Sequence, residues 1–258
     1  MPGRKYDSSK KRVRPVFDAL WSHGRDWLPQ LLALPTGGCV DAKIESRDLT
    51  LVEGHWEPDE KCLNPPVSLL SWLIRNVDSL VSTEPSNKFR RRLAMGDPDT
   101  IEHALRLLRT EDATRAWYIF EAPTCPDVYL VARGALVVVE GKRTERSTTI
   151  DTTWLPGRHQ IWRHLDATWE LRGRRAVYGL FIVESDESTD GSVPELWRNL
   201  AQECLDACVL RTSFPHRSAE EVAAISRCYL GVTTWRRVCE QFHIDWRTLP
   251  HEVSSHGA

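Results

Sequence analysis

Apolar side chains recur every three or four positions along much of the chain, which is the spacing of one face of an α-helix. Prolines mark the start of two of these segments, at Asn64-Pro65-Pro66 and at Asp97-Pro98-Asp99. The pattern predicts helices over residues 16–34 (with a break at Pro29), 64–81, 87–95, 97–108, 156–171, 194–210, 218–230 and 235–242.

Shorter runs rich in β-branched and aromatic residues interrupt this pattern and predict strands. Arg133-Gly134 separates two of the runs and predicts a tight hairpin turn between them. The strands are expected over residues 116–121, 128–132, 135–140 and 176–184, with one or two less regular strands within 41–60. From residue 97 to 184 the predicted order is therefore helix, strand, strand, strand, helix, strand.

Charge and pattern together divide the chain into four regions. Residues 1–14 carry six basic side chains and one acid, which predicts a basic flexible tail. We expect residues 15–95 to form a mostly helical region and residues 96–185 to hold the α/β core. Residues 186–258 are expected to form a helical region packed on that core.

The composition excludes some classes of protein. With 41% hydrophobic and 27% charged residues, the chain is typical of a globular protein. No apolar run reaches the roughly 18 residues of a membrane span, and the N-terminus lacks the apolar core of a signal peptide. We therefore expect a cytoplasmic protein with no membrane partner. The net charge of -2 argues against coating of nucleic acid through bulk charge.

The seven cysteines show no CxxC pair. Cys204 and Cys208 are four apart, but no second pair of cysteines or histidines follows at the spacing of a zinc finger. The pattern favours scattered, mostly buried free thiols in a reducing cytoplasm.

Three charged residues fall at one end of the predicted hairpin. If the turn lies at residues 133 and 134, Asp127 is opposite Glu140, about 5 Å away on the same face of the sheet. Lys142 is two residues beyond Glu140 and shares that face. Two carboxylates this close in an apolar surrounding repel each other, and a divalent cation such as Mg²⁺ or Mn²⁺ removes the repulsion. The amine of Lys142 could then orient or deprotonate a metal-bound water, or stabilise developing charge.

Pro126-Asp127 followed by Glu140-Gly141-Lys142 resembles the motif of the PD-(D/E)xK nuclease superfamily, and the predicted αβββαβ order resembles the core of that superfamily. The resemblance covers residues 97–184. It implies an α/β, restriction-endonuclease-like core with a mixed sheet, extended by helical regions at both ends. It also implies a Mg²⁺-dependent (or Mn²⁺-dependent) hydrolase of nucleic-acid phosphodiester bonds, with DNA favoured over RNA. Asp127, Glu140 and the Gly141 carbonyl would hold the metal, and Lys142 would be the catalytic amine.

Two rival motifs are set aside because of their context. Asp41-Ala42-Lys43 also matches (D/E)xK, but it follows a glycine-rich turn instead of an apolar strand. Pro98-Asp99 is a second PD dipeptide, and it belongs to a helix start.

Further residues extend the candidate site. The first core helix of the superfamily often supplies another acid, for which Glu102 is the best match, and Glu121 is an alternative. Gln160 and His164 are four apart and share a helix face. The RecB-like branch has a glutamine at the first of these positions and a tyrosine at the second, where this chain has His164. His164 is either a phosphate contact or a structural histidine.

Basic residues follow the motif. Residues 141–175 hold eight bases and four acids, a surplus of four positive charges. A groove that follows the phosphates of a nucleic acid and a solvated helix face both fit this surplus. The candidate nucleic-acid contacts are Arg143, Arg146, Arg158, Arg163 and His164.

Two other functions remain open. The first is a catalytically inactive module of the nuclease fold that binds nucleic acid or a protein partner. The second is a transcription regulator that uses the helical pair over residues 218–243, which resembles a helix-turn-helix in outline. The complete Asp127, Glu140 and Lys142 set weighs against the inactive module, and the small positive charge of the helical pair weighs against the regulator.

Overall fold

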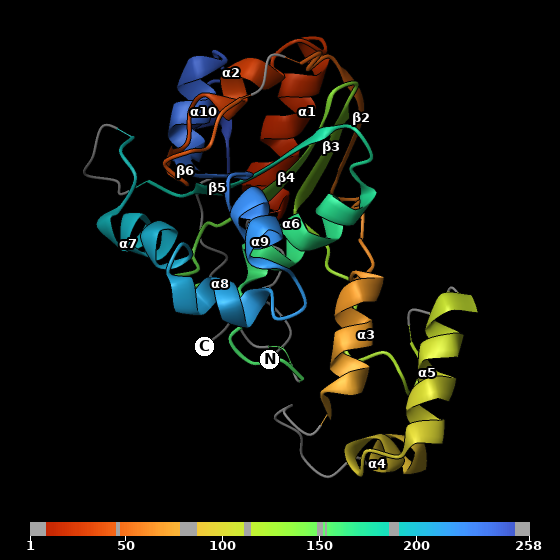
Figure 1. Cartoon of the computed structure of the whole chain (residues 1–258). Coiled ribbons are helices and arrows are strands. Elements are labelled where there is room, and N and C mark those ends of the chain that lie inside the picture. Colours follow the sequence, from red (N-terminus) through yellow and green to blue (C-terminus); the bar gives the residue numbers. More distant parts are fainter. Residues whose placement is uncertain are drawn as a thin grey trace, which may run out of the picture.

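A six-stranded mixed sheet forms the centre of the protein in the computed structural model, which describes residues 9–44, 47–77, 87–110, 115–148, 152, 154–185 and 191–250 (Figure 1). The strand order across the sheet is β1-β6-β5-β4-β3-β2. The strands are β1 (Thr36–Gly37), β2 (Leu51–Trp56), β3 (Val128–Ala132), β4 (Ala135–Gly141), β5 (Ala176–Val183) and β6 (Tyr229–Thr234).

Strands β2, β3 and β4 pair antiparallel, whereas β5 is parallel to β4 and β6 is parallel to β5. Both α/β class and mixed sheet are therefore as expected. The β3–β4 hairpin has the predicted register, because Val128 pairs with Val139 and Val131 pairs with Leu136. This register places the turn at residues 133 and 134. At Gly134 a Cβ atom would lie 2.8 Å from Arg47 Cβ, so a side chain there would crowd the neighbouring segment.

Helices cover both faces of the sheet through two apolar clusters (Figure 1). On one face lie α1 (Arg14–Ser22), α2 (Leu28–Leu32) and α10 (Trp235–Gln241). On the other lie α6 (Gln160–Leu171), α7 (Glu195–Glu203), α8 (Ala207–Ser213) and α9 (Ala219–Ser226). Because both faces are covered, every residue of β4 and β5 is buried, and Glu140 is the one charged residue in these two strands.

A helical unit stands apart from the sheet, between β2 and β3 in sequence (Figure 1). It consists of α3 (Val67–Arg75), α4 (Lys88–Ala94) and α5 (Pro98–Thr110), which share a third apolar cluster. The expected boundary at residue 95 would separate α5 from α3 and α4, and the structure instead keeps the three together. Leu80 and Val81, expected at the end of the first of these helices, lie outside the described residues.

Two predictions of secondary structure are wrong. Residues 116–121 form turns instead of a strand, and their rings pack on the helical unit: Trp117 stacks on Phe89 with centroids 4.8 Å apart. Residues 229–234 form β6, so the pair of helices over 218–243 is not a helix-turn-helix. The outer regions are likewise not only helical, because they supply β1, β2 and β6 to the sheet.

The described part of the expected flexible tail is ordered by a buried arginine. Residues Ser9–Val13 form a π-helical turn that leads into α1. Arg12 is 1% exposed and pairs with Glu184 at 2.8 Å, directly after β5. Residues 1–8 lie outside the described part of the chain.

One disulfide contradicts the expectation that all seven thiols are free. Cys62 is bonded to Cys125, and the adjacent Leu63 and Thr124 form an isolated β-bridge. The bond joins the segment before α3 to the segment before β3. The other five cysteines form no disulfide: Cys39, Cys204, Cys208, Cys228 and Cys239.

Within the described ranges, no helix combines the length and apolar character needed to cross a membrane.

Candidate functional site

The β3–β4 hairpin brings the motif residues together at one end of the sheet. Asp127 directly precedes β3, Glu140 lies near the end of β4, and Lys142 follows β4. Glu140 and Lys142 are two residues apart and so point to the same face, which is covered by α6. The first turns of α6 add Gln160 and His164, four apart on one helix face as predicted.

Glu140 is the hub of this cluster and is only 3% exposed. Its Oε1 accepts hydrogen bonds from Lys142 Nζ at 2.8 Å and from Gln160 Nε2 at 2.7 Å. Its Oε2 lies 3.0 Å from His164 Nε2. Because a carboxylate accepts only, Nε2 carries the hydrogen in this contact. Two oxygens thus receive three donors, which compensates for burial of the charge.

The charges of the cluster shift its pKa values strongly. Burial raises the pKa of Glu140, but the Lys142 ammonium and the hydrogen bond from His164 outweigh it and lower that pKa to about 2. Burial lowers the pKa of Lys142, and the charges of Glu140 and Asp127 outweigh it, so the net shift is upward. Lys142 is therefore an ammonium at neutral pH, a hydrogen-bond donor and not a free base.

Asp127 is half-buried at the edge of the cluster. Its Oδ2 accepts a hydrogen bond from the backbone N of Gly141 at 2.8 Å. The N–H and C=O of one strand residue point to the same side of the strand, so the Gly141 carbonyl also faces the side on which Asp127 lies. On the other side of β4, the backbone of Lys142 is fixed by Ile182, Glu184 and the indole of Trp235.

His164 is too deeply buried to contact a phosphate, which was one of the two roles predicted for it. It is 1% exposed, and while Nε2 faces Glu140, Nδ1 lies 2.9 Å from Thr124 Oγ1. Thr124 stands beside the Cys62–Cys125 disulfide, so the disulfide-linked segment helps to hold the imidazole in place. His164 is thus a positioning residue for Glu140.

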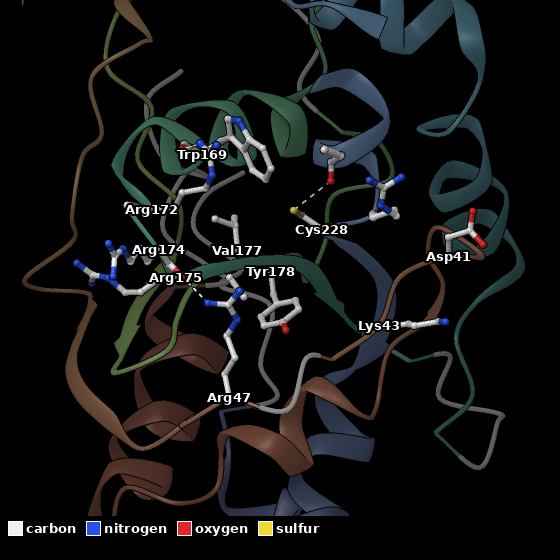
Figure 2. A pocket seen from close by; sticks show the side chains of 14 residues that line it. Asp41, Lys43, Arg47, Trp169, Arg172, Arg174, Arg175, Val177, Tyr178 and Cys228 are labelled. Atoms are coloured by element: carbon white, nitrogen blue, oxygen red, sulfur yellow. Dashed lines mark hydrogen bonds between the residues drawn. The ribbon is translucent and has the colours of Figure 1, made fainter. Parts of the chain in front are cut away.

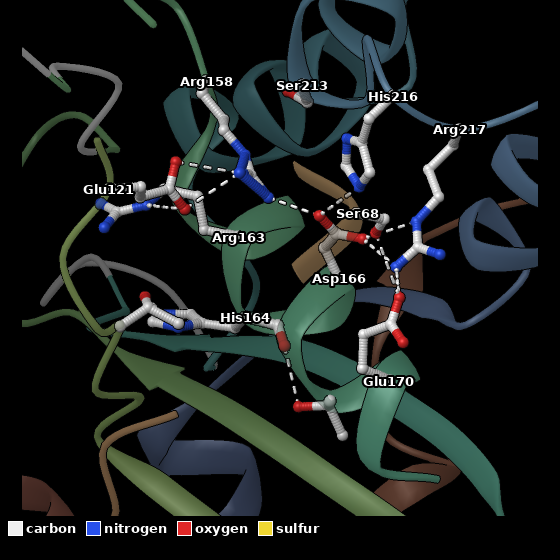
Figure 3. A network of polar contacts seen from close by, with 12 residues as sticks. Ser68, Glu121, Arg158, Arg163, His164, Asp166, Glu170, Ser213, His216 and Arg217 are labelled. Carbon is white, nitrogen blue, oxygen red and sulfur yellow. Dashed lines mark hydrogen bonds and ion pairs between the residues drawn. The ribbon is translucent and has the colours of Figure 1, made fainter. Parts of the chain in front are cut away.

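Arg158 is also not available to a nucleic acid. It is fully buried and donates to both oxygens of Glu121 at 2.9 Å and to Asp166 Oδ2 at 2.6 Å (Figure 3). Asp166 pairs in turn with Arg217, whose Nη2 is 2.9 Å away. Burial raises the pKa of Asp166, but His216 and the two arginines outweigh it and lower the pKa. This internal network holds α6 against its neighbours. Glu121, the alternative acid for the candidate site, is engaged in this network.

The remaining candidate contacts are nearer the surface. Arg143 is half-buried and Arg146 is exposed in the segment after Lys142. Arg163 lies 3.7 Å from Glu121, and burial lowers its pKa. Together with Arg90 and Arg115 it lines a pocket of about 410 Å³ beside the helical unit.

Glu102 is not brought to the site. It is exposed on α5, which packs on α3 and α4 within the helical unit that stands apart from the sheet (Figure 1). The prediction took α5 for the first core helix, whereas α1 precedes the first strand of the sheet.

The donors suit only one kind of metal site. Among the residues that the structure describes, no three His, Cys, Asp or Glu side chains converge to hold a metal. Two carboxylates and one carbonyl are too few for a closed zinc or calcium cage. They fit Mg²⁺, which is commonly bound through one or two carboxylates and completes its shell with water and substrate phosphate.

No pattern in the sequence pointed to Thr124, which belongs to the site through its contact with His164.

Comparison with family models, with curated proteins and with solved structures finds no match to this chain.

Proposed function

We propose that this protein is a Mg²⁺-dependent (or Mn²⁺-dependent) nuclease that hydrolyses phosphodiester bonds, with DNA as the favoured substrate. The observation that carries the proposal is the convergence of Asp127, Glu140 and Lys142 at one end of a buried strand pair. Lys142 Nζ lies 2.8 Å from Glu140 Oε1, and it feels the charge of Asp127. Buried charged groups held this closely are typical of catalytic sites.

The arrangement of elements supports a relationship to the PD-(D/E)xK superfamily. With α2 and the two-residue strand β1 left aside, the order α1, β2, β3, β4, α6, β5 has the αβββαβ pattern, with an antiparallel meander followed by a parallel strand. The first helix and first strand differ from those predicted, and the helical unit α3–α5 is an insertion after the first strand. The two motif segments occupy the second and third strands in this order.

Asp127, Glu140 and the Gly141 carbonyl would hold the metal. When bound, Mg²⁺ neutralises phosphate charge and lowers the pKa of a bound water. Gln160 and His164 keep Glu140 in its present orientation through their hydrogen bonds, so the carboxylate is preorganised. Lys142 supplies a positive charge and a hydrogen-bond donor that can stabilise negative charge on the phosphoryl oxygens in the transition state.

Arg163, Arg143 and Arg146 would contact the phosphates that flank the reacting bond. None of the three is buried as Arg158 is, although Arg163 also lies 3.7 Å from Glu121 of the internal network. Their role is to position the nucleic-acid backbone, which carries no sequence information by itself.

A substrate panel tests this function. Purified protein is incubated with circular, linear and single-stranded DNA and with RNA, in Mg²⁺, in Mn²⁺ and in EDTA. We expect cleavage of at least one DNA in either metal and none in EDTA, with loss of cleavage in Asp127→Ala and Lys142→Ala. Cleavage that survives both substitutions would reject the site. Binding of nucleic acid without cleavage under every condition would favour the inactive-module alternative.

A further inference from the structure

A basic pocket lies at the opposite end of the sheet from the Glu140 cluster (Figure 2). It has a volume of about 1020 Å³ and is lined partly by Ala176 and Val177, the first residues of β5. Val177 pairs with Leu136, whereas the cluster is level with Ile182, the partner of Gly141. Five strand residues separate the two levels, or about 17 Å.

The charge of the pocket is strongly one-sided. Its lining includes six basic side chains and a single acid, Asp41. The bases come from three separate segments of the chain, which only the fold brings together: Lys43, Arg47, Arg172, Arg174, Arg175 and Arg227. Like charges gathered in this way repel one another unless an anion is bound, so a ligand of negative charge is favoured here.

Other contacts shape the pocket. Arg47 donates to the backbone carbonyl of Arg174, which links the segment after β1 to the turn before β5. The guanidinium of Arg172 lies over the ring of Trp169, 3.5 Å from its centroid, at the end of α6. Within the described chain, no ion pair to a carboxylate involves Lys43, Arg174 or Arg227. These three cations are exposed and face solvent.

We propose that this pocket binds the phosphate backbone of a nucleic acid at a second site, distinct from the Glu140 cluster. A site for a small molecule is usually apolar and buries most of its ligand. Here half of the lining residues are charged and four of the six cations are exposed, which suits an extended polyanion held by its phosphates. The choice of nucleic acid over other polyanions rests on the proposed function. The pocket would then hold one part of the substrate while another part reaches the Glu140 cluster.

The test measures binding in EDTA by fluorescence anisotropy, with labelled duplex and single-stranded DNA over a range of salt concentrations. The test variant combines Lys43→Gln, Arg174→Gln and Arg227→Gln. The control combines Arg109→Gln, Arg198→Gln and Arg211→Gln, three exposed arginines outside the pocket that change the net charge equally. Melting curves of both variants verify that they fold.

We expect the test variant to bind duplex DNA roughly tenfold or more weakly than the wild type, and the control to differ by about twofold or less. Each lost phosphate contact lowers the slope of log K against log salt by about 0.9, so the slope should fall by about 2.7 in the test variant. Equal binding by the test and control variants would overturn the proposal.

Two further arms separate other ligands of similar charge. One uses ATP and the other uses vesicles that contain phosphatidylserine. Binding of either by the wild type, without binding of DNA, would also overturn the proposal. Binding is measured in EDTA, where no cleavage takes place. The binding assay therefore tests the pocket, and the cleavage assay separately tests the Glu140 cluster.

Discussion

Glu140 shows how a buried carboxylate can remain charged. Three donors surround its two oxygens, and one of them is an ammonium. Asp166 on α6 is likewise surrounded by donors, in its case from Arg158 and Arg217, at the centre of a network of buried ion pairs. The two carboxylates differ in their surroundings: Glu140 has the half-buried Asp127 beside it, whereas every close partner of Asp166 is basic.

Breaking the internal network should destabilise the protein. Arg158→Met keeps much of the side-chain volume but leaves Glu121 and Asp166 with fewer partners in a buried place. We expect the free energy of unfolding to fall by about 3 kcal/mol, measured by urea denaturation. Arg211→Met, an exposed arginine on α8, should change it by about 0.5 kcal/mol or less. A loss below about 1 kcal/mol in Arg158→Met would contradict the assigned role.

His159 should make stability depend on pH. Burial, together with the nearby charges of His164 and Lys142, lowers the pKa of His159 to about 4 from its ordinary 6.5. The unfolded chain therefore takes up a proton at this histidine between pH 6.5 and 4 while the folded chain does not, so stability is lost as the pH falls through that window.

At pH 5 this histidine alone should cost about 2 kcal/mol relative to pH 7. His159→Gln removes the titrating group, so its stability should fall less between pH 7 and pH 5 than that of the wild type. Urea denaturation of both proteins at the two pH values gives the difference. An identical fall in both would show that His159 titrates normally.

At the scale of elements, the β3–β4 hairpin was predictable because its two apolar runs flank a single turn, which fixes the register and hence the pairing of residues 127 and 140. Strand β6 was not predictable, because Gly231 was interpreted as the residue that ends the preceding helix. In the structure Gly231 has a φ of 99°, and a Cβ atom there would lie 2.1 Å from the backbone oxygen of Thr36 in β1. The glycine permits two backbones to approach, which only the fold reveals.

The run over residues 116–121 was mistaken for a strand for a related reason. Its aromatic residues satisfy the composition of a strand, but they pack on α4 and on Trp154 instead of on the sheet. The true first strand of the meander, β2, has mixed burial and therefore a weak pattern. Side-chain composition alone could not distinguish packing on the helical unit from packing in the sheet. Because α5 was then interpreted as the first core helix, Glu102 was wrongly expected at the site.

The Cys62–Cys125 disulfide ties the helical insertion to the sheet across a sequence separation of 63 residues. By the loop-closure estimate, a cross-link over such a loop stabilises the folded state by about 4 kcal/mol. We expect protein purified without reductant to show five reactive thiols when unfolded, and reduction to lower its melting temperature. A count of seven thiols under these conditions would show that the bond is absent.

At the scale of the whole molecule, a net charge of -2 conceals a strong separation of charge. The surplus of basic residues after the motif is split by the fold: Arg158 is internal, and Arg172, Arg174 and Arg175 join the basic pocket. The Glu140 cluster and the pocket lie at opposite ends of the β4–β5 pair, near the two ends of α6. Neither the net charge nor the number of basic residues after the motif predicts this arrangement.

In the proposed function, Lys142 acts with Asp127 and Glu140 in phosphodiester hydrolysis. The most direct measurement compares initial cleavage rates on one labelled DNA in Mg²⁺ for the wild type, Lys142→Met and Lys61→Met, an exposed lysine outside the cluster. Glu140→Gln and Glu102→Gln form a second matched pair. We predict rates reduced by about 10²- to 10³-fold in Lys142→Met and Glu140→Gln, and rates near the wild type in Lys61→Met and Glu102→Gln. Cleavage by Lys142→Met and Glu140→Gln at the wild-type rate would show that these two residues do not catalyse the reaction.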